Sequence, residues 1–273
     1  MLRQAIIPLA GQGTRLLPLS SILPKELLPI NGKSNLEYIL DECIEAGIKE
    51  FIFIISKKKE SIKKYFFNDQ FYKSILVKKK DKRILQVYKN LKKYQKMIKF
   101  VYQNEPRGTG DAILKCKKYI KSSHFLMLFP DDLIIKKNCS KEMISLHKKT
   151  KGSIIATKTV KKENISRYGV LSFVNKKKNY FQIKDVVEKP SIIDAPSNHA
   201  IIGRYILPKT IMHKLKFLKP GKGGEIHITD AIKQLIQEDE IFYGSIFKGK
   251  YLDCGTLSGY IKSGIEISRE LKK

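Results

Sequence analysis

The sequence of 273 residues is poor in the residues that bind structural metals or crosslink a chain. Its four cysteines, at positions 43, 116, 139 and 254, are far apart and form no CxxC or Cys/His ligand pattern. We therefore expect reduced cysteines that pack as small hydrophobic side chains. No run reaches the ~18 apolar residues that a membrane span needs, and the first apolar stretch begins almost at Met1, too early for a signal peptide. We expect a soluble, cytoplasmic protein without a membrane anchor.

Arginine is also scarce, although the chain is strongly basic. Only seven of the 54 basic residues are arginine, while the formal net charge is +28. Clustered cations release counterions from nucleic acids, so a nucleic-acid-binding protein is one interpretation. Arginine, however, is the preferred residue for phosphate forks and base edges, and the lysines are spread along the whole chain. The composition therefore favours a solvated lysine surface over a specific nucleic-acid site.

The early part of the chain alternates strand and helix patterns. "QAIIPL" (4–9) and "EFIFIIS" (50–56) have the short, apolar, β-rich composition of buried strands. Between them, "SNLEYILDECIEAG" (34–47) has apolar residues at helical spacing, and Ser34 and Glu37 form a capping box at its start. A strand–helix–strand unit of this length predicts two parallel strands with a right-handed crossover.

The same alternation continues to the end of the chain. The apolar run 124–129 is typical of a central parallel strand that is covered on both faces. The lysine-rich stretch 57–98 has weak periodicity, and we expect it to add helices and a loop; from 168 the pattern becomes richer in strands. The sequence predicts a single α/β domain with a mostly parallel central sheet, flanking helices and a β-rich later portion.

A glycine-rich loop follows the first predicted strand. Gly11 and Gly13 would let phosphate oxygens approach the main chain, and Arg15 would add a fixed positive fork. The Walker pattern GxxxxGK[ST] is absent, and the dinucleotide pattern GxGxxG fails because Leu16 stands at the last glycine position. The loop therefore predicts a phosphate-binding cradle of another kind, at the ligand-binding edge of the sheet.

The whole segment "LAGQGTRLLPLSSILPKELLPI" (9–30) resembles the nucleotide-binding signature of sugar-1-phosphate nucleotidyltransferases, G-x-G-T-R followed by P-K-x-x-L-P. The resemblance implies a Rossmann-like nucleotidyltransferase domain. It also implies that Lys25 contacts the phosphates at the reaction centre, with Arg15 and Lys189 as the other catalytic cations. The expected nucleotide-binding positions in this segment are Leu9, Ala10, Gly11 and Gly13.

Further motifs follow in the order of that family. "QNEPRGTGDAIL" (103–114) resembles its base-binding loop, "LFPDD" (128–132) and "LDCGT" (252–256) provide acidic residues, and "VVEKP" (186–190) resembles its sugar-phosphate segment. The resemblance implies that Gln103 reads the pyrimidine edge and that Gly108 lets the backbone close on the base. It assigns the sugar phosphate to Gly169, Glu188, Lys189 and Gly203, and a Mg²⁺ ion to Asp131 and Asp253.

Within the family, "APSNHAIIGRYIL" and "GGEIHITDAI" look most like the bacterial UTP–glucose-1-phosphate uridylyltransferase branch. The implied reaction joins UTP and glucose 1-phosphate into UDP-glucose and pyrophosphate. Thr109 and Asp111 depart from the Leu and His common in this branch, beside the base loop. A thymidylyl- or other nucleotidyltransferase and a non-catalytic regulatory homologue therefore remain alternatives.

The resemblance further implies a homo-oligomer, either a dimer or a tetramer. Within the single domain, residues 1–273, we expect three parts along the chain. They are a nucleotide-binding half of about 1–135, a sugar-phosphate-binding half of about 136–255, and a C-terminal helix of about 256–273.

Overall fold

A nine-stranded mixed sheet forms the centre of the molecule. The computed structural model describes residues 2–271, and so leaves the last two residues of the expected C-terminal helix outside the described part. From one edge of the sheet to the other, the strands are β5 (Ile98–Tyr102), β4 (Glu50–Ile55), β1 (Gln4–Pro8), β6 (His124–Leu128), β11 (His199–Pro208), β8 (Ser153–Thr159), β12 (Phe242–Ile246), β10 (Tyr180–Glu188) and β9 (Gly169–Val174).

The sheet has a parallel half and a mixed half. Strands β5, β4, β1 and β6 are all parallel neighbours, as the βαβ pattern predicts. Beyond β6, only β8 and β12 pair in parallel, and the other pairings are antiparallel. Strand β11 also pairs with β9, so that β11, β8, β12, β10 and β9 make a closed ring of pairings. This ring is the expected β-rich portion.

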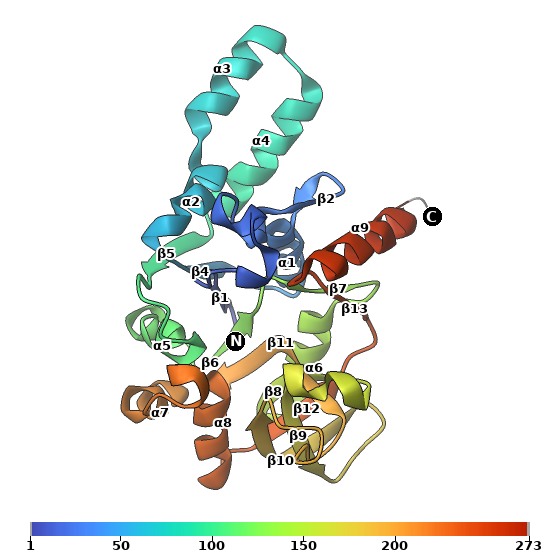
Figure 1. The fold of residues 1–273 in the computed structure, drawn as a ribbon. Coiled ribbons are helices and arrows are strands. Elements are labelled where there is room, and N and C mark those ends of the chain that lie inside the picture. Colours follow the sequence, from blue (N-terminus) through green and yellow to red (C-terminus); the bar gives the residue numbers. More distant parts are fainter. Residues whose placement is uncertain (1, 272–273) are drawn as a thin grey trace.

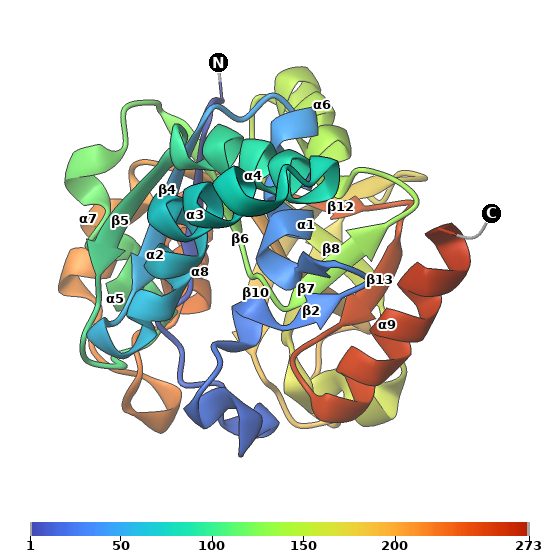
Figure 2. The same cartoon turned by 90° about the horizontal axis from the view of Figure 1, so that it is seen from above.

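Helices cover both faces of the sheet (Figures 1 and 2). One hydrophobic cluster contains side chains of α1, α2, α4, α6 and α9, and a second contains side chains of α5, α7 and α8. The helices are α1 (Asn35–Glu45), α2 (Glu60–Phe67), α3 (Asp69–Lys79), α4 (Lys82–Gln95), α5 (Thr109–Leu114), α6 (Cys139–Thr150), α7 (Ile211–Phe217), α8 (Ile228–Gln237) and α9 (Leu257–Leu271).

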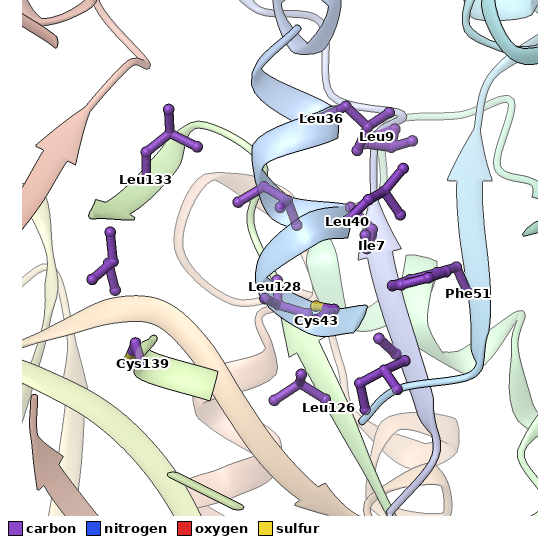
Figure 3. Packing of buried hydrophobic residues seen from close by; sticks show 14 of the residues in the cluster. Ile7, Leu9, Leu36, Leu40, Cys43, Phe51, Leu126, Leu128, Leu133 and Cys139 are labelled. Atoms are coloured by element: carbon purple, nitrogen blue, oxygen red, sulfur yellow. The ribbon is translucent and has the colours of Figure 1, made fainter. Parts of the chain in front are cut away.

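The two clusters explain why successive residues of the central strands are mostly apolar. In β6, Leu126 and Leu128 belong to the first cluster, whereas Phe125 and Met127 belong to the second. Figure 3 shows α1 lying over β1 and β6 with its apolar side chains between them. The predicted capping box of α1 is present: Ser34 Oγ accepts the Glu37 N–H, and the Glu37 carboxylate accepts the Ser34 N–H. All four cysteines are reduced and buried, as expected.

The lysine-rich stretch 57–98 forms helices α2, α3 and α4. The α3–α4 hairpin projects away from the rest of the molecule (Figure 1), and Tyr72 and Tyr88 stack between its two helices with ring centroids 5.5 Å apart. The base of the hairpin is anchored in the core through Leu91 and Tyr94 of α4, which share a hydrophobic cluster with Phe66 of α2. Along residues 2–271, no helix has the length and apolarity that crossing a bilayer requires.

Small elements not foreseen from the sequence complete the fold. Helix α7 and strand β12 lie within the second half, and two short strand pairs lie apart from the large sheet. These pairs are β7 (Asp132–Ile135) with β13 (Lys250–Asp253), and β2 (Pro29–Ile30) with β3 (Lys33–Ser34). The β7–β13 pair matters for function because its register places Asp132 opposite Asp253.

Candidate active site

A cavity of about 350 Å³ opens at the carboxyl edge of the parallel half, where this class of sheet binds ligands. It is bordered by the loop after β1, the end of β6, the first residue of β9, the end of β10 and the end of β13. The structure brings nine of the residues expected from the sequence to its wall, namely Gly11, Arg15, Lys25, Asp131, Gly169, Glu188, Lys189, Gly203 and Asp253.

The loop after β1 places the first two cations. Gly13 has a left-handed φ of 70°, and a Cβ there would lie 3.2 Å from Ser20 Cβ and 3.6 Å from Lys25 Cδ. Ser20 Oγ also donates to Gly13 O at 2.8 Å. Gly13 is therefore not on the cavity wall but packs against the stem of Lys25. Gly11 lies on the wall, and no atom stands within 4 Å of the Cβ position there.

Asp131 is the acidic centre of this part of the site. Its Oδ2 lies 2.6 Å from Lys25 Nζ and 3.5 Å from Arg15 Nη2. Burial alone would raise the pKa of Asp131, but the two cations outweigh that effect and bring it below its usual value. Burial alone would lower the pKa of Lys25, and Asp131 and Glu26 raise it above its usual value. Both side chains are therefore charged at neutral pH.

Asp253 borders the same small space from β13. A Cβ placed on Gly255 would lie 2.8 Å from Asp131 Oδ2 and 3.1 Å from Asp253 Oδ1. Within residues 2–271, no group of three or more His, Cys, Asp or Glu side chains gathers as metal ligands would. Mg²⁺ is commonly held by one or two carboxylates together with substrate phosphates. The two aspartates fit such a site, in which substrate phosphates would complete the coordination.

The Asp132 carboxylate has hydrogen-bond partners that differ from the ion-pair partners of Asp131. Tyr251 donates its hydroxyl to Asp132 Oδ1 at 2.6 Å, and the Gly203 N–H donates to Oδ2 at 3.2 Å. Burial, followed by the nearby Asp131 charge, raises the pKa of Asp132 to about 6. A Cβ on Gly203 would lie only 2.3 Å from Asp132 Oδ2. The close approach to Asp132 thus explains why glycine is needed at 203.

The opposite wall of the cavity carries Glu188 and Lys189, at the end of β10. Thr229 Oγ1 donates to Glu188 Oε2 at 2.9 Å, and Lys189 Nζ lies 3.2 Å from Glu188 Oε1. A Cβ on Gly169 would come within 3.3 Å of Glu188 Oε2 and 2.9 Å of an Ile201 methyl group. The glycine leaves room for the carboxylate to face the cavity.

The expected base-binding residues do not reach this cavity. Gln103 Nε2 donates to Asp111 Oδ2 at 2.7 Å and to Gly108 O at 3.1 Å, so both amide hydrogens hold the loop itself. Gly108 has a φ of 95°, and a Cβ there would lie 2.6 Å from Ile226 O. Leu9 is buried and donates its N–H to Ile54 O at 2.7 Å, and Ala10 is absent from the wall. Asp111, the departure noted in the sequence, is thus a partner of Gln103.

Several wall residues were missed by sequence reasoning. Arg167 donates Nη2 to Asp253 Oδ2 at 2.9 Å, and Tyr251 and Thr229 hold acidic side chains of the site. Arg167 directly precedes the "YGV" motif and is one of only seven arginines. These two features could have marked it as a candidate site residue. Glu26 also lines the cavity and pairs with buried Lys59 at 2.8 Å, a contact between distant segments that no local pattern reveals.

Comparisons with known proteins agree with this geometry. A family model described as nucleotidyl transferase matches residues 4–270. The UTP–glucose-1-phosphate uridylyltransferase of Mycoplasma pneumoniae is 35% identical over 267 residues, which cover 97% of this chain and 91% of that protein. The Bacillus subtilis protein of the same name is 34% identical over 275 residues, which cover 99% of this chain and 92% of that protein.

Solved structures show the same likeness. A UDP-glucose pyrophosphorylase complexed with UDP-glucose has a TM-score of 0.88 and 35% identity, and the match covers 99% of this chain and 100% of that one. The UTP-bound UGPase from Acinetobacter baumannii has a TM-score of 0.89 and 30% identity, with 99% of this chain and 94% of that one covered. The family expected from the sequence motifs is confirmed. This chain belongs to the nucleotidyl transferase family.

Proposed function

We propose that this protein transfers the uridylyl group of UTP to glucose 1-phosphate, giving UDP-glucose and pyrophosphate. The observation that carries the proposal is that Arg15, Lys25, Asp131 and Lys189, from four separate motifs, line one cavity. The motifs around it and the uridylyltransferase relatives of nearly full length support this choice of substrates.

The chemistry needs no general base. The attacking oxygen of glucose 1-phosphate is already an anion, and the obstacle is its repulsion from the triphosphate. Two unit charges about 4 Å apart interact by roughly 4 kcal/mol at an effective dielectric near 20, and several such pairs meet at once. Lys25 and Arg15 would neutralise the triphosphate, and Lys189 would neutralise the sugar phosphate. Catalysis then rests on positioning and charge, as is usual for phosphoryl transfer.

We assign Mg²⁺ to Asp131 and Asp253. When bound, the ion would neutralise phosphate charge and help to align the two substrates. The protein groups around it have separate tasks: Lys25 and Arg15 hold Asp131, and Arg167 and the Gly255 N–H hold Asp253 at 2.9 Å and 2.8 Å. These contacts keep both carboxylates at one small space before substrate arrives.

Sugar recognition falls to Glu188. Its carboxylate, oriented by Thr229 on α8, would accept hydrogen bonds from sugar hydroxyls, while Lys189 takes the phosphate. A site built to hydrogen-bond hydroxyl groups rejects analogues that lack them. We assign the base to the Gln103–Gly108 loop, which would have to exchange its contact with Asp111 for one with uracil.

We also propose how the chain is divided between the two substrates. The change from a parallel half to a closed ring supports a nucleotide-binding part of about 1–135 and a sugar-phosphate-binding part of about 136–255. We further propose that the protein acts in the cytoplasm as a homo-oligomer, for which light scattering of the purified protein is the direct measurement.

The test is an assay of pyrophosphate release with Mg²⁺, glucose 1-phosphate and each nucleoside triphosphate in turn. Release that is at least tenfold faster with UTP than with dTTP supports the proposal. Faster release with dTTP would make the protein a thymidylyltransferase. No release with any triphosphate, together with tight binding of UDP-glucose, would make it a regulatory homologue.

A further inference from the structure

Arg204, in the middle of β11, is the largest fully buried side chain of the described chain outside the apolar residues. All of its N–H groups have partners. Nε donates to both Glu42 carboxylate oxygens at 3.3 Å, Nη1 donates to Phe129 O at 3.1 Å and Gly203 O at 3.0 Å, and Nη2 donates to Glu42 Oε2 at 3.0 Å and Asp132 O at 2.6 Å.

The two carbonyls that Arg204 holds on the β6 side lie on either side of Asp131. Phe129 and Asp132 begin and end a turn in which the Asp132 N–H donates to Phe129 O at 3.4 Å. The guanidinium thus donates hydrogen bonds to both ends of the short segment that contains Asp131, the ion-pair partner of Lys25. The Phe129 N–H donates to Gly203 O at 2.9 Å, which ties the same segment to β11.

The Arg204 guanidinium is in turn held by side chains of two helices, α1 and α6. Glu42 on α1 neutralises its charge, and the N–H and hydroxyl of Ser140 on α6 donate to Glu42 Oε1 at 3.0 Å and 2.6 Å. A buried charge is tolerated only when it is paired and hydrogen-bonded, and here both conditions are met. Arg204, Glu42 and Ser140 therefore join α1 and α6 to the turn through buried side chains that do not line the cavity.

Lysine could not replace this arrangement. A planar fork with five N–H groups reaches two carbonyls and a carboxylate in fixed directions, whereas an ammonium has three donors at one point. In a chain with 54 basic residues and only seven arginines, Arg15 and Arg167 line the cavity and Arg204 lies behind it. Three of the seven arginines therefore lie at or directly behind this site.

We propose that Arg204 is a positioning residue, which anchors the Phe129–Asp132 turn and thereby holds Asp131 in place for Lys25 and the metal ion. The inference rests on the proposed function, because it takes Asp131 as a metal ligand. Its effect on the site is indirect, since Arg204 has no exposed surface from which to touch substrate.

The test compares Arg204→Lys, which keeps the charge but loses the fork, with the wild type in two measurements. The first is acetylation of Lys25 by acetic anhydride, followed by peptide mass spectrometry, which needs neither metal nor turnover. Lys25 Nζ lies 2.6 Å from Asp131 Oδ2, and loss of this ion pair would leave the amine more accessible to the reagent. The second is Mn²⁺ binding in the presence of UTP, followed by electron paramagnetic resonance.

We expect several-fold faster acetylation of Lys25 in Arg204→Lys, approaching that of Asp131→Asn, and at least tenfold weaker Mn²⁺ binding. Met143→Ala is the matched control, because Met143 is a buried residue of α6 that takes no part in the hydrogen bonds of Arg204 and Glu42. It should leave both measurements at the wild-type level. If Arg204→Lys fails to fold, Glu42→Met/Arg204→Met removes both buried charges and takes its place.

A folded variant with wild-type acetylation and wild-type Mn²⁺ binding overturns the inference. A rise in acetylation that Met143→Ala reproduces also overturns it, because the effect would then follow general loss of stability. Faster acetylation in Arg204→Lys alone, with a wild type that neither binds Mn²⁺ nor releases pyrophosphate, would confirm the anchor and contradict the proposed function instead.

Discussion

Lys25 lies among three charged side chains, Asp131, Glu26 and Arg15. It is mostly buried, pairs with Asp131 at 2.6 Å, and its pKa is raised by Asp131 and Glu26 despite the opposing effect of burial. A cation held in this way before substrate arrives needs no reorganisation when negative charge develops on the phosphates. Its effect should therefore appear in the chemical step more than in binding.

We predict that Lys25→Ala lowers kcat by about 10²–10³-fold, with a much smaller rise in the KM for UTP. Steady-state pyrophosphate release at varied UTP concentration measures both. Lys33→Ala is the control, because Lys33 is an exposed lysine that pairs with Asp41 at 2.8 Å on the surface. An unchanged kcat in Lys25→Ala would remove Lys25 from the reaction centre.

Lys189 stands on the other wall, beside Glu188. We predict that Lys189→Ala raises the KM for glucose 1-phosphate by about tenfold or more, because it removes a charge-assisted contact to the sugar phosphate. The KM for UTP should change far less. Lys184→Ala, an exposed position on the same strand, is the control. An equal rise in both KM values would assign Lys189 to the triphosphate.

For individual residues, the sequence predicted site residues that lie in motifs. It missed residues whose role depends on contacts with distant parts of the chain. Arg15, Lys25, Asp131 and Glu188 each lie in a recognisable run and reach the cavity. Arg167 and Thr229 meet their carboxylate partners 86 and 41 residues away along the chain. Such pairs depend on how strands and helices pack, which no local spacing encodes.

The contact between β6 and α6 contains a pair of histidines. The rings of His124 on β6 and His147 on α6 have centroids 4.6 Å apart, and His124 Nε2 is buried without a hydrogen-bond partner. His147 Nδ1 lies 2.7 Å from Gly152 O and must donate its proton to that carbonyl. Burial, followed by the neighbouring His147, lowers the pKa of His124 to about 4.

This contact predicts a loss of stability in mild acid. The unfolded chain, with a histidine pKa of about 6.5, binds more protons than the folded one between about pH 6.5 and pH 4. The free energy of unfolding should therefore fall as the pH drops through this range, and then level off. Because the ring is only half-buried, we expect a difference on the order of 1 kcal/mol.

Thermal melts at pH 7 and pH 5 measure the effect. The wild type should lose about 2–4 °C more in Tm between these pH values than His124→Gln, which cannot titrate. His213→Gln on α7 is the control and should behave like the wild type, because position 213 is exposed. The same pH dependence in wild type and His124→Gln would contradict the assignment.

For helices and strands, the strength of the local sequence pattern decided which of them could be predicted. The first parallel strands, α1 and its capping box carry strong signals and were foreseen. Strands β7 and β13 have only four residues each, and their pairing joins segments more than 100 residues apart. The ring closure of β11 with β9 likewise rests on one long-range pairing, Ala200 with Val170. The strand pattern after residue 168 predicted a β-rich portion but not how it closes.

The whole molecule carries a formal net charge of +28, while both proposed substrates are anions. A strongly positive surface raises the local concentration of anionic ligands and speeds their encounter, and salt screens this effect over about 10 Å at 0.1 M. The same field attracts any polyanion without sequence preference. The lysine-rich surface thus favours substrate capture and weak, salt-sensitive RNA binding together.

We predict that kcat/KM for UTP falls several-fold between roughly 0.02 M and 0.2 M KCl. Added RNA should inhibit at the lower salt concentration and lose its effect at the higher one. Sucrose at matched osmolality controls for solvent effects and should leave kcat/KM unchanged. RNA inhibition that persists at high salt would instead indicate a specific nucleic-acid site.

The central claim is that the sugar phosphate itself attacks the α-phosphorus while both substrates occupy one cavity. The most direct test uses UTPαS of a single configuration at the α-phosphorus, with ³¹P NMR of the UDP-glucose analogue that forms. A single in-line displacement predicts inversion of configuration at phosphorus. Retention would require a nucleotidylated side chain as an intermediate, and would contradict the account.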